Sequence, residues 1–114
     1  MNWLAMFAAL SGAMAVGAGA FGAHGASAQP AEWLKTGAHY QLIHAVAALV
    51  ALRLEARGPA TLFVLGGLIF AGTLYLMALG APRWFGAITP IGGAALIAGW
   101  LWLAWLGRGW TIGT

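Results

Sequence analysis

Four apolar stretches, each almost free of charge, constrain this chain more than any other feature. They cover residues 3–23, 37–53, 60–79 and 86–106. A transmembrane α-helix needs roughly 20 predominantly apolar residues, and about 17 are tolerated. The chain is 62% hydrophobic and 6% charged, whereas a typical soluble domain is about a quarter charged. We therefore expect lipid to be the solvent of most of the surface.

The apolar stretches predict helices and not strands. Their Ala- and Leu-rich runs lack the alternation of a half-buried strand, and four segments are too few to close a membrane barrel. Short connections at residues 24–36, 55–59 and 80–84 would make neighbouring helices antiparallel. The sequence thus predicts an all-α membrane protein, with one domain over residues 1–114 that folds as an up-down bundle of four antiparallel transmembrane helices.

The charged residues indicate topology and not a nucleic-acid partner, because the five cations are scattered. With the N-terminus inside, the cytoplasmic side would carry Arg53, Arg57 and Arg108, and the other side Lys35 and Arg83. This bias favours an N-in, C-in orientation. Residues 26–28 resemble a signal-peptidase site, but the preceding stretch has no basic residue and is long for a signal core, so we expect no cleavage.

Small residues recur along three of the four stretches. Residues 17–22 spell G-x-G-x-x-G, but they lie inside an apolar helix and not between a strand and a helix, so the match to a dinucleotide motif is accidental. Small residues four apart let helix backbones approach closely, within one molecule or between copies. We expect a homo-oligomer or a larger membrane complex, besides lipid contact. The predicted packing positions are Gly12, Gly19, Gly22, Gly67, Gly72, Gly92 and Gly93.

The second stretch carries the most informative polar residues. Gln41 and His44 are three residues apart and share a helix face. His39 lies about 140° from His44 around a straight helix, so the two cannot meet at one centre. The antiparallel topology gathers the polar side chains in one leaflet and leaves the other with little beyond Ser11 and Thr61. The candidate cluster is His24, His39, Tyr40, Gln41, His44, Thr73, Tyr75 and Thr89.

Two interpretations of this cluster remain open. The side chains could be hydrogen-bonding contacts between helices, or they could serve a ligand, proton or cofactor, since ionisable residues in a membrane are functional candidates. No carboxylate lies in a spanning segment and the H-x-x-x-H spacing is absent, so we predict no metal site, no catalytic residues and no enzyme. The leading hypothesis is a non-enzymatic accessory or scaffold subunit that associates with itself or a larger complex. The alternative is a binding or transport module for a small solute, quinone or haem; the cofactor remains unknown.

The start of the fourth helix also has two interpretations. Thr89 as a cap followed by Pro90 in the first turn is a standard helix start. A kinked helix that begins near Phe85 is the alternative, and we favour the first.

Four ordered motifs carry a family resemblance. Residues 19–24, residues 36–44, residues 70–75 and residues 89–100 include Gly-Ala-Phe-Gly-Ala-His, Tyr-Gln with His44, Phe-Ala-Gly-Thr-Leu-Tyr, and Thr-Pro-Ile-Gly-Gly. With them the chain resembles the family called domain of unknown function 423, which includes transmembrane protein 256. The resemblance implies a four-helix inner-membrane protein and implies no particular activity.

Overall fold

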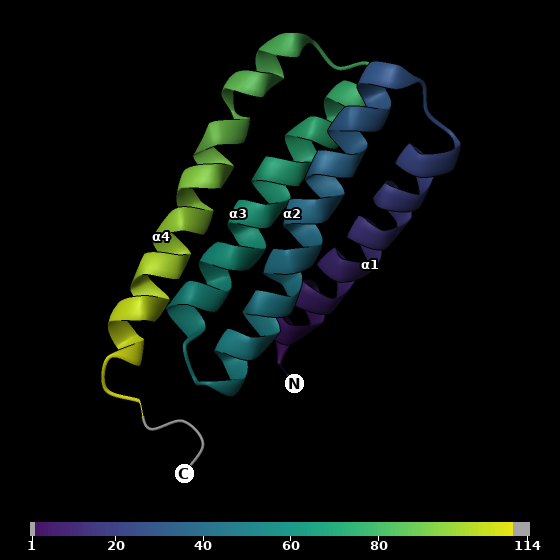
Figure 1. Ribbon diagram of the computed structural model, residues 1–114. Coiled ribbons are helices and arrows are strands. Elements are labelled where there is room, and N and C mark those ends of the chain that lie inside the picture. Colours follow the sequence, from purple (N-terminus) through teal and green to yellow (C-terminus); the bar gives the residue numbers. More distant parts are fainter. Residues whose placement is uncertain (1, 111–114) are drawn as a thin grey trace.

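The computed structural model describes residues 2–110. Four α-helices run up and down: α1 (Trp3–His24), α2 (Ala28–Arg53), α3 (Arg57–Ala78) and α4 (Thr89–Gly107), with the 3-10 helix η1 (Arg83–Ala87) before α4 (Figure 1). No strand occurs within residues 2–110. The all-α, up-down architecture predicted from the sequence is therefore confirmed.

The second helix is longer than the sequence predicts. It begins at Ala28, whereas the apolar pattern places its start at residue 37, so most of the expected loop at residues 24–36 is helical. The reason is packing of the added turns on α1. Leu34 is buried, and a Cβ atom on Gly22 would lie only 3.0 Å from its Cβ atom. The early turns of α2 thus have an apolar side. It is not apparent from the sequence, because charged and polar residues lower the hydropathy of this stretch.

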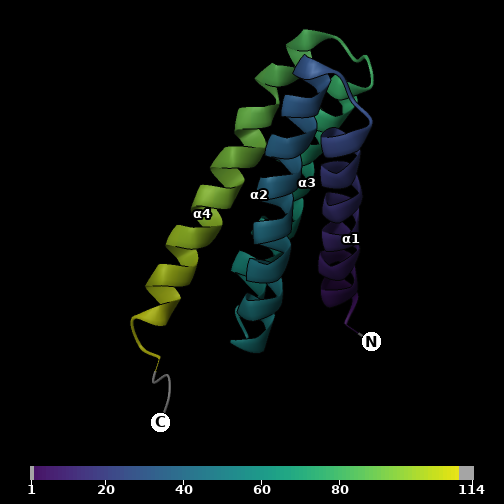
Figure 2. The ribbon, with the colours of Figure 1, turned by 45° about the vertical axis from the view of Figure 1, so that its right-hand side comes forward.

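The helices form a row and not a closed ring. α2 packs between α1 and α3, and α4 packs on the other side of α3. α1 and α4, at the ends of the row, make no comparable contact within the described part of the chain. Figure 2 shows α4 leaning away from α2 toward the end that carries the C-terminus. One side of α2 is consequently left without a helix over it.

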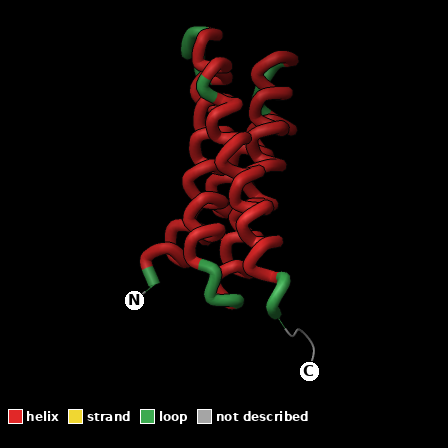
Figure 3. The backbone as a smooth tube through the Cα atoms, turned by 90° about the vertical axis from the view of Figure 1, so that its left-hand side faces the viewer, coloured by secondary structure: helices red, strands yellow, loops and turns green. Residues whose placement is uncertain are grey.

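The dimensions suit a lipid bilayer. Three segments, Trp3–His24, Arg57–Ala78 and Arg83–Gly107, are long and apolar enough to cross a membrane by length and composition. α2 has 26 residues, about 39 Å at 1.5 Å per residue, which exceeds the roughly 30 Å hydrocarbon core. It is less apolar than the other three because it carries most of the polar residues. The start of α1 and the end of α4 lie at the same end of the bundle (Figure 3).

Small residues bring α4 against α3. A Cβ atom on Gly92 would lie 2.4 Å from the backbone nitrogen of Phe70 and 2.8 Å from the carbonyl oxygen of Gly66. Since these atoms belong to the backbone, no side-chain movement could relieve the clash. Gly66 mirrors this arrangement, because its own Cβ position lies 3.0 Å from the carbonyl oxygen of Gly92. The two helices are therefore in direct backbone contact here.

Most other predicted packing glycines also face a neighbouring helix. Gly12 faces Ala45 and Gly19 faces Ala38, at 3.7 Å and 3.4 Å from the glycine's ideal Cβ position. By the same measure Gly67 lies 3.9 Å from the Cβ atom of His44 and Gly93 lies 3.7 Å from Phe70, whereas nothing approaches Gly72 within 4 Å.

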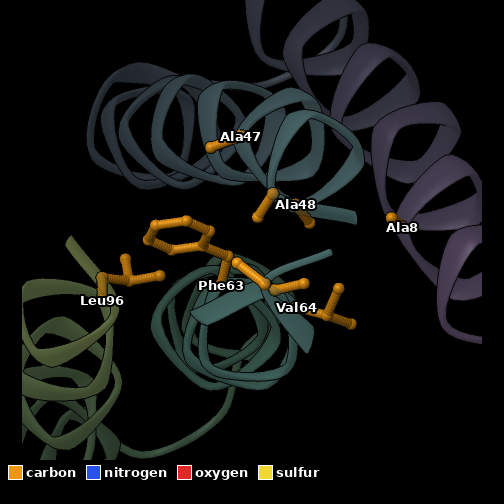
Figure 4. Packing of buried hydrophobic residues seen from close by; sticks show 9 residues of the cluster. Ala8, Ala47, Ala48, Phe63, Val64 and Leu96 are labelled. Carbon is orange, nitrogen blue, oxygen red and sulfur yellow. The ribbon is translucent and has the colours of Figure 1, made fainter. Parts of the chain in front are cut away.

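The apolar core lies toward the end of the bundle that holds the termini. Alanines on α1 and α2 leave room for larger side chains from α3 and α4 (Figure 4). Phe63 is almost fully buried, beside Val64 of the same helix. The labelled members of this cluster are Ala8, Ala47, Ala48, Phe63, Val64 and Leu96.

We predict that Gly92→Ala destabilises the protein by about 1–3 kcal/mol, the usual cost of overpacking, because the new methyl group must push α4 away from α3. Gly72→Ala is the matched control: it meets nothing within 4 Å and should be neutral or slightly stabilising, since Ala favours helix over Gly. Thermal unfolding in a mild detergent measures both. Equal stability of the two variants would contradict the backbone contact.

Candidate functional site

Gln41 joins three helices through its side-chain amide. The side chain is 1% exposed. Its Nε2 donates to Ser11 Oγ of α1 at 2.9 Å and approaches Met14 Sδ at 3.4 Å. Its Oε1 accepts from the hydroxyl group of Tyr75 of α3 at 2.6 Å. Both ends of the amide are thus used, and the donor and acceptor sides point to opposite neighbours.

Gly37 makes room for this arrangement. A Cβ atom at Gly37 would lie 2.7 Å from Cε1 of the Tyr75 ring and 3.4 Å from the Cα atom of Ala71. The Tyr75 ring therefore lies across the glycine one turn before Gln41. That position lets the hydroxyl group reach the amide oxygen.

His44 joins α2 to α4. The indole Nε1 of Trp100 donates to His44 Nε2 at 2.9 Å, and His44 Nδ1 lies 2.6 Å from the carbonyl oxygen of Tyr40. An indole nitrogen only donates, so Nε2 must be the unprotonated nitrogen, and Nδ1 then carries the proton and donates to the carbonyl. His44 is accordingly a neutral ring with both nitrogens engaged.

Aromatic rings surround His44. Its ring centroid lies 5.6 Å from Phe63, 5.8 Å from Trp100 and 6.3 Å from Tyr40, the last with nearly parallel planes. These rings cover the imidazole, which is 6% exposed.

A third polar contact joins α3 to α4. The hydroxyl groups of Thr73 and Thr89 lie 2.6 Å apart, and Thr73 also donates back to the carbonyl oxygen of Ile69. Thr89 is therefore not the helix cap that the sequence suggests: Ile88 holds the cap position and makes no side-chain cap. Pro90 does lie in the first turn.

The longer α2 changes the depth of the cluster. From Ala28, Gln41 is about 20 Å and His44 about 24 Å along the helix at 1.5 Å per residue, whereas a start at residue 37 implies about 6 Å and about 10 Å. Gln41 lies at the level of Ser11, which the sequence assigns to the opposite leaflet. The cluster accordingly lies around the middle of the bundle. Thr73 and Thr89 extend it toward the end of the bundle where α4 begins.

The predicted candidates fall into two groups. Gln41, His44, Thr73, Tyr75 and Thr89 all make contacts between helices. His24 and His39 are exposed, and Tyr40 is 43% exposed on the side of α2 near α4.

Two partners, Ser11 and Trp100, were missed by sequence reasoning. Ser11 lies one turn from Ala8 and Ala15, both buried, so the helical spacing of small residues could have placed it on the inner face. Trp100 lies in the middle of α4, away from the helix ends where membrane tryptophans collect. That unusual position could have indicated that the Trp100 side chain has a partner inside the bundle.

The five cluster members that join helices form their hydrogen bonds inside the chain: Gln41, His44, Thr73, Tyr75 and Thr89. Over residues 2–110, each buried side-chain nitrogen or oxygen atom has a hydrogen-bond partner. In the same range, no group of three His, Asp or Glu side chains is suited to hold a metal ion. These hydrogen bonds join the helices to one another.

These features define a small helical membrane protein whose helices are joined by buried polar contacts. Comparison with known proteins agrees: the profile described as "Protein of unknown function (DUF423)" matches residues 18–93. The chain belongs to this family.

Its relatives are named as membrane proteins. A "UPF0382 membrane protein" of Haemophilus influenzae is 42% identical over 107 residues, covering 85% of this chain and 86% of the relative. The "UPF0382 inner membrane protein YgdD" of Escherichia coli K12 is 37% identical over 110 residues, covering 87% and 84%. A Staphylococcus haemolyticus relative is 37% identical over 114 residues, covering 90% and 93%. No solved structure matches the chain significantly.

We predict that Tyr75→Phe destabilises the bundle by about 0.6–1.7 kcal/mol, from the average to the maximum measured for hydrogen bonds between membrane helices, because the Gln41 carbonyl loses its donor. Tyr40→Phe is the matched control: its hydroxyl group makes no hydrogen bond with any residue that the structure describes, so stability should not change. Unfolding in mixed detergent measures both variants. In a double-mutant cycle, Tyr75→Phe should cost no further stability in a protein that already carries Gln41→Leu. Additive losses of stability would contradict the contact.

Proposed function

We propose that the protein is a non-enzymatic accessory or scaffold subunit of the inner membrane, and that all four helices cross the bilayer with both termini in the cytoplasm. The observation that carries this proposal is the internal satisfaction of the polar cluster. Gln41 and Tyr75 form hydrogen bonds between helices, and His44 bonds to Trp100 of α4 and to the Tyr40 carbonyl of its own helix, as expected of a rigid packing unit. A transport path would need polar groups that a solute can reach.

The topology follows from the charges at the two ends of the bundle. Arg53, Arg57 and Arg108 lie at the end that holds the termini, and Lys35 and Arg83 lie toward the other end. Cytoplasmic segments carry an excess of Lys and Arg, so the end with three cations is assigned to the cytoplasm. Snorkelling of Arg53 from the end of α2 is compatible with a crossing by that helix.

The same contacts weigh against the alternative of a haem or solute module at the cluster. Axial ligation of haem uses a free imidazole nitrogen, and His44 would have to give up either Trp100 or the Tyr40 carbonyl to provide one. Gln41 likewise has no free end. The accessory role asks for no such rearrangement.

The surface for association is the outer side of α1. Ala9, Ala13 and Gly17 are exposed and spaced four residues apart, and nothing lies within 4 Å of a Cβ atom at Gly17. The inner small residues Gly12, Gly19 and Gly22 already contact α2. Small-xxx-small spacing allows close approach of a second helix. One such face of α1 packs on α2, and the other is exposed and available to a partner.

The chain contains no cysteine, so single cysteines can report topology without a background. We predict that Glu55→Cys and Gly109→Cys react with a membrane-impermeant maleimide only after the cells are permeabilised. Ser27→Cys and Pro82→Cys should react in intact cells. The parent chain is the control. Labelling of Ser27→Cys and Glu55→Cys from the same side would show that α2 does not cross.

We predict that the wild-type protein is an oligomer by native mass spectrometry from mild detergent, and that Gly17→Leu shifts it to the monomer because the side chain separates the α1 surfaces. Ala98→Leu, which adds similar bulk to the exposed side of α4, should leave the oligomer intact. A strictly monomeric wild type without a co-purifying membrane partner would refute the accessory role.

A further inference from the structure

A groove runs along the side of the bundle that α4 leaves open. It has a volume of about 400 Å³ and is bounded by α2, α3 and α4. Three aromatic rings and His44 form much of its wall, with Gly93 of α4 opening it toward Phe70. The lining residues are Tyr40, His44, Phe70, Gly93, Leu96, Ile97 and Trp100.

A second, wholly apolar trough continues from this groove. It has a volume of about 290 Å³ and lies between α2 and α4. Trp100 lines both spaces, so the trough and the groove meet at its ring. The lining residues of the trough are Ile43, Val46, Ala47, Val50, Trp100 and Leu103.

One of the residues that line the groove has a hydroxyl group that the bundle does not use. Tyr40 lines it, and the Tyr40 hydroxyl makes no hydrogen bond with any of residues 2–110. The ring is held in place by Phe70, whose centroid lies 4.7 Å away. A polar group without a partner in hydrocarbon is costly, so this donor favours an occupant that brings an acceptor.

Depth narrows the chemistry of that occupant. Tyr40 lies about 18 Å from the start of α2 at 1.5 Å per residue, near the middle of the helix, and a crossing by α2 would place its Cα atom inside the hydrocarbon. A phospholipid keeps its charged headgroup at the surface and cannot place an acceptor there. A neutral ring with carbonyl oxygens can lie at this depth, and its flat faces suit offset packing on aromatic side chains.

We propose that the groove binds the ring of a membrane quinone, an amphiphile with a planar carbonyl-bearing head and an apolar tail. The head lies against Tyr40, Phe70 and Trp100 and accepts a hydrogen bond from the Tyr40 hydroxyl. The tail follows the trough along Val46 and Val50. The ligand enters sideways from the lipid, so the His44–Trp100 and Gln41–Tyr75 contacts stay intact.

The groove shares Tyr40 and His44 with the polar cluster, but its occupant would use only the Tyr40 hydroxyl and would leave the hydrogen bonds of His44 in place. Binding in the groove does not depend on self-association. The mid-membrane depth of Tyr40 rests on the crossing of α2, which the cysteine labelling tests separately. Oligomer formation can fail while the groove binds, and the reverse also holds.

The test is titration of the purified protein in detergent with decylubiquinone, read as quenching of tryptophan fluorescence. We expect saturable quenching for the wild type. Tyr40→Phe should weaken the apparent affinity about 5- to 10-fold, the effect of one lost hydrogen bond. Gly93→Leu should remove the saturable component because the side chain fills the groove. Ala98→Leu, the control of similar bulk on the outer side of α4, should bind as the wild type does.

Folding of each variant is checked by its thermal unfolding. If Gly93→Leu is unfolded, Gly93→Ala replaces it, since a methyl group there meets Phe70 at an ordinary 3.7 Å and should give a partial loss. Linear, unsaturable quenching of the wild type would overturn the proposal, as would equal affinity for Tyr40→Phe. Competition by decanol as strong as that by the quinone would assign the groove to acyl chains and overturn it too.

Discussion

The amide of Gln41 is the constraint on which the rest of the bundle depends. A polar group in a membrane interior must find its partners inside the protein, and this side chain finds them on both neighbours of α2, at Ser11 and Tyr75. Its two ends differ chemically, since one donates and the other accepts. The contact therefore fixes which neighbour lies on which side of α2 and at which height. Apolar packing alone would let such alanine-rich helices slide along one another. Sliding would break the hydrogen bonds of the Gln41 amide, so the amide fixes the register.

Backbone proximity plays the same part on the other side of α3. Gly66 and Gly92 let α3 and α4 touch, and the Thr73–Thr89 pair sets their register near one end. Farther along, α4 leaves α2, and the Trp100–His44 hydrogen bond spans the widening gap. An open side of the bundle follows, lined by the aromatic residues. The fully bonded interior and the open groove thus arise from one arrangement: the helices form a row in which only neighbours in the chain pack closely.

Much of the architecture was predictable because its cause is local. Runs of apolar residues with short connections predict up-down helices, and glycine spacing predicted close contacts at Gly12, Gly19 and Gly92. The early turns of α2 were not predictable by hydropathy, because Leu34 is buried against Gly22 of another helix while its neighbours Glu32 and Lys35 face outward. The predicted distances of Gln41 and His44 from the start of α2 were too short for that reason. Helix-face geometry correctly separated His39 from His44, but Ser11 and Trp100 required the tertiary arrangement.

The unequal polarity of the four helices bears on how the chain enters the membrane. α2 is the least apolar of the four and carries the amide and imidazole that need partners. As a lone segment in hydrocarbon it would leave Gln41 unbonded, whereas α1 already holds Ser11 at the matching height. In the four-crossing arrangement α1 and α2 are joined by a few residues and would insert together as a hairpin, with α1 acting as the local solvent for its neighbour. In that arrangement, the order of the helices along the chain would bring Ser11 into the membrane before or together with Gln41.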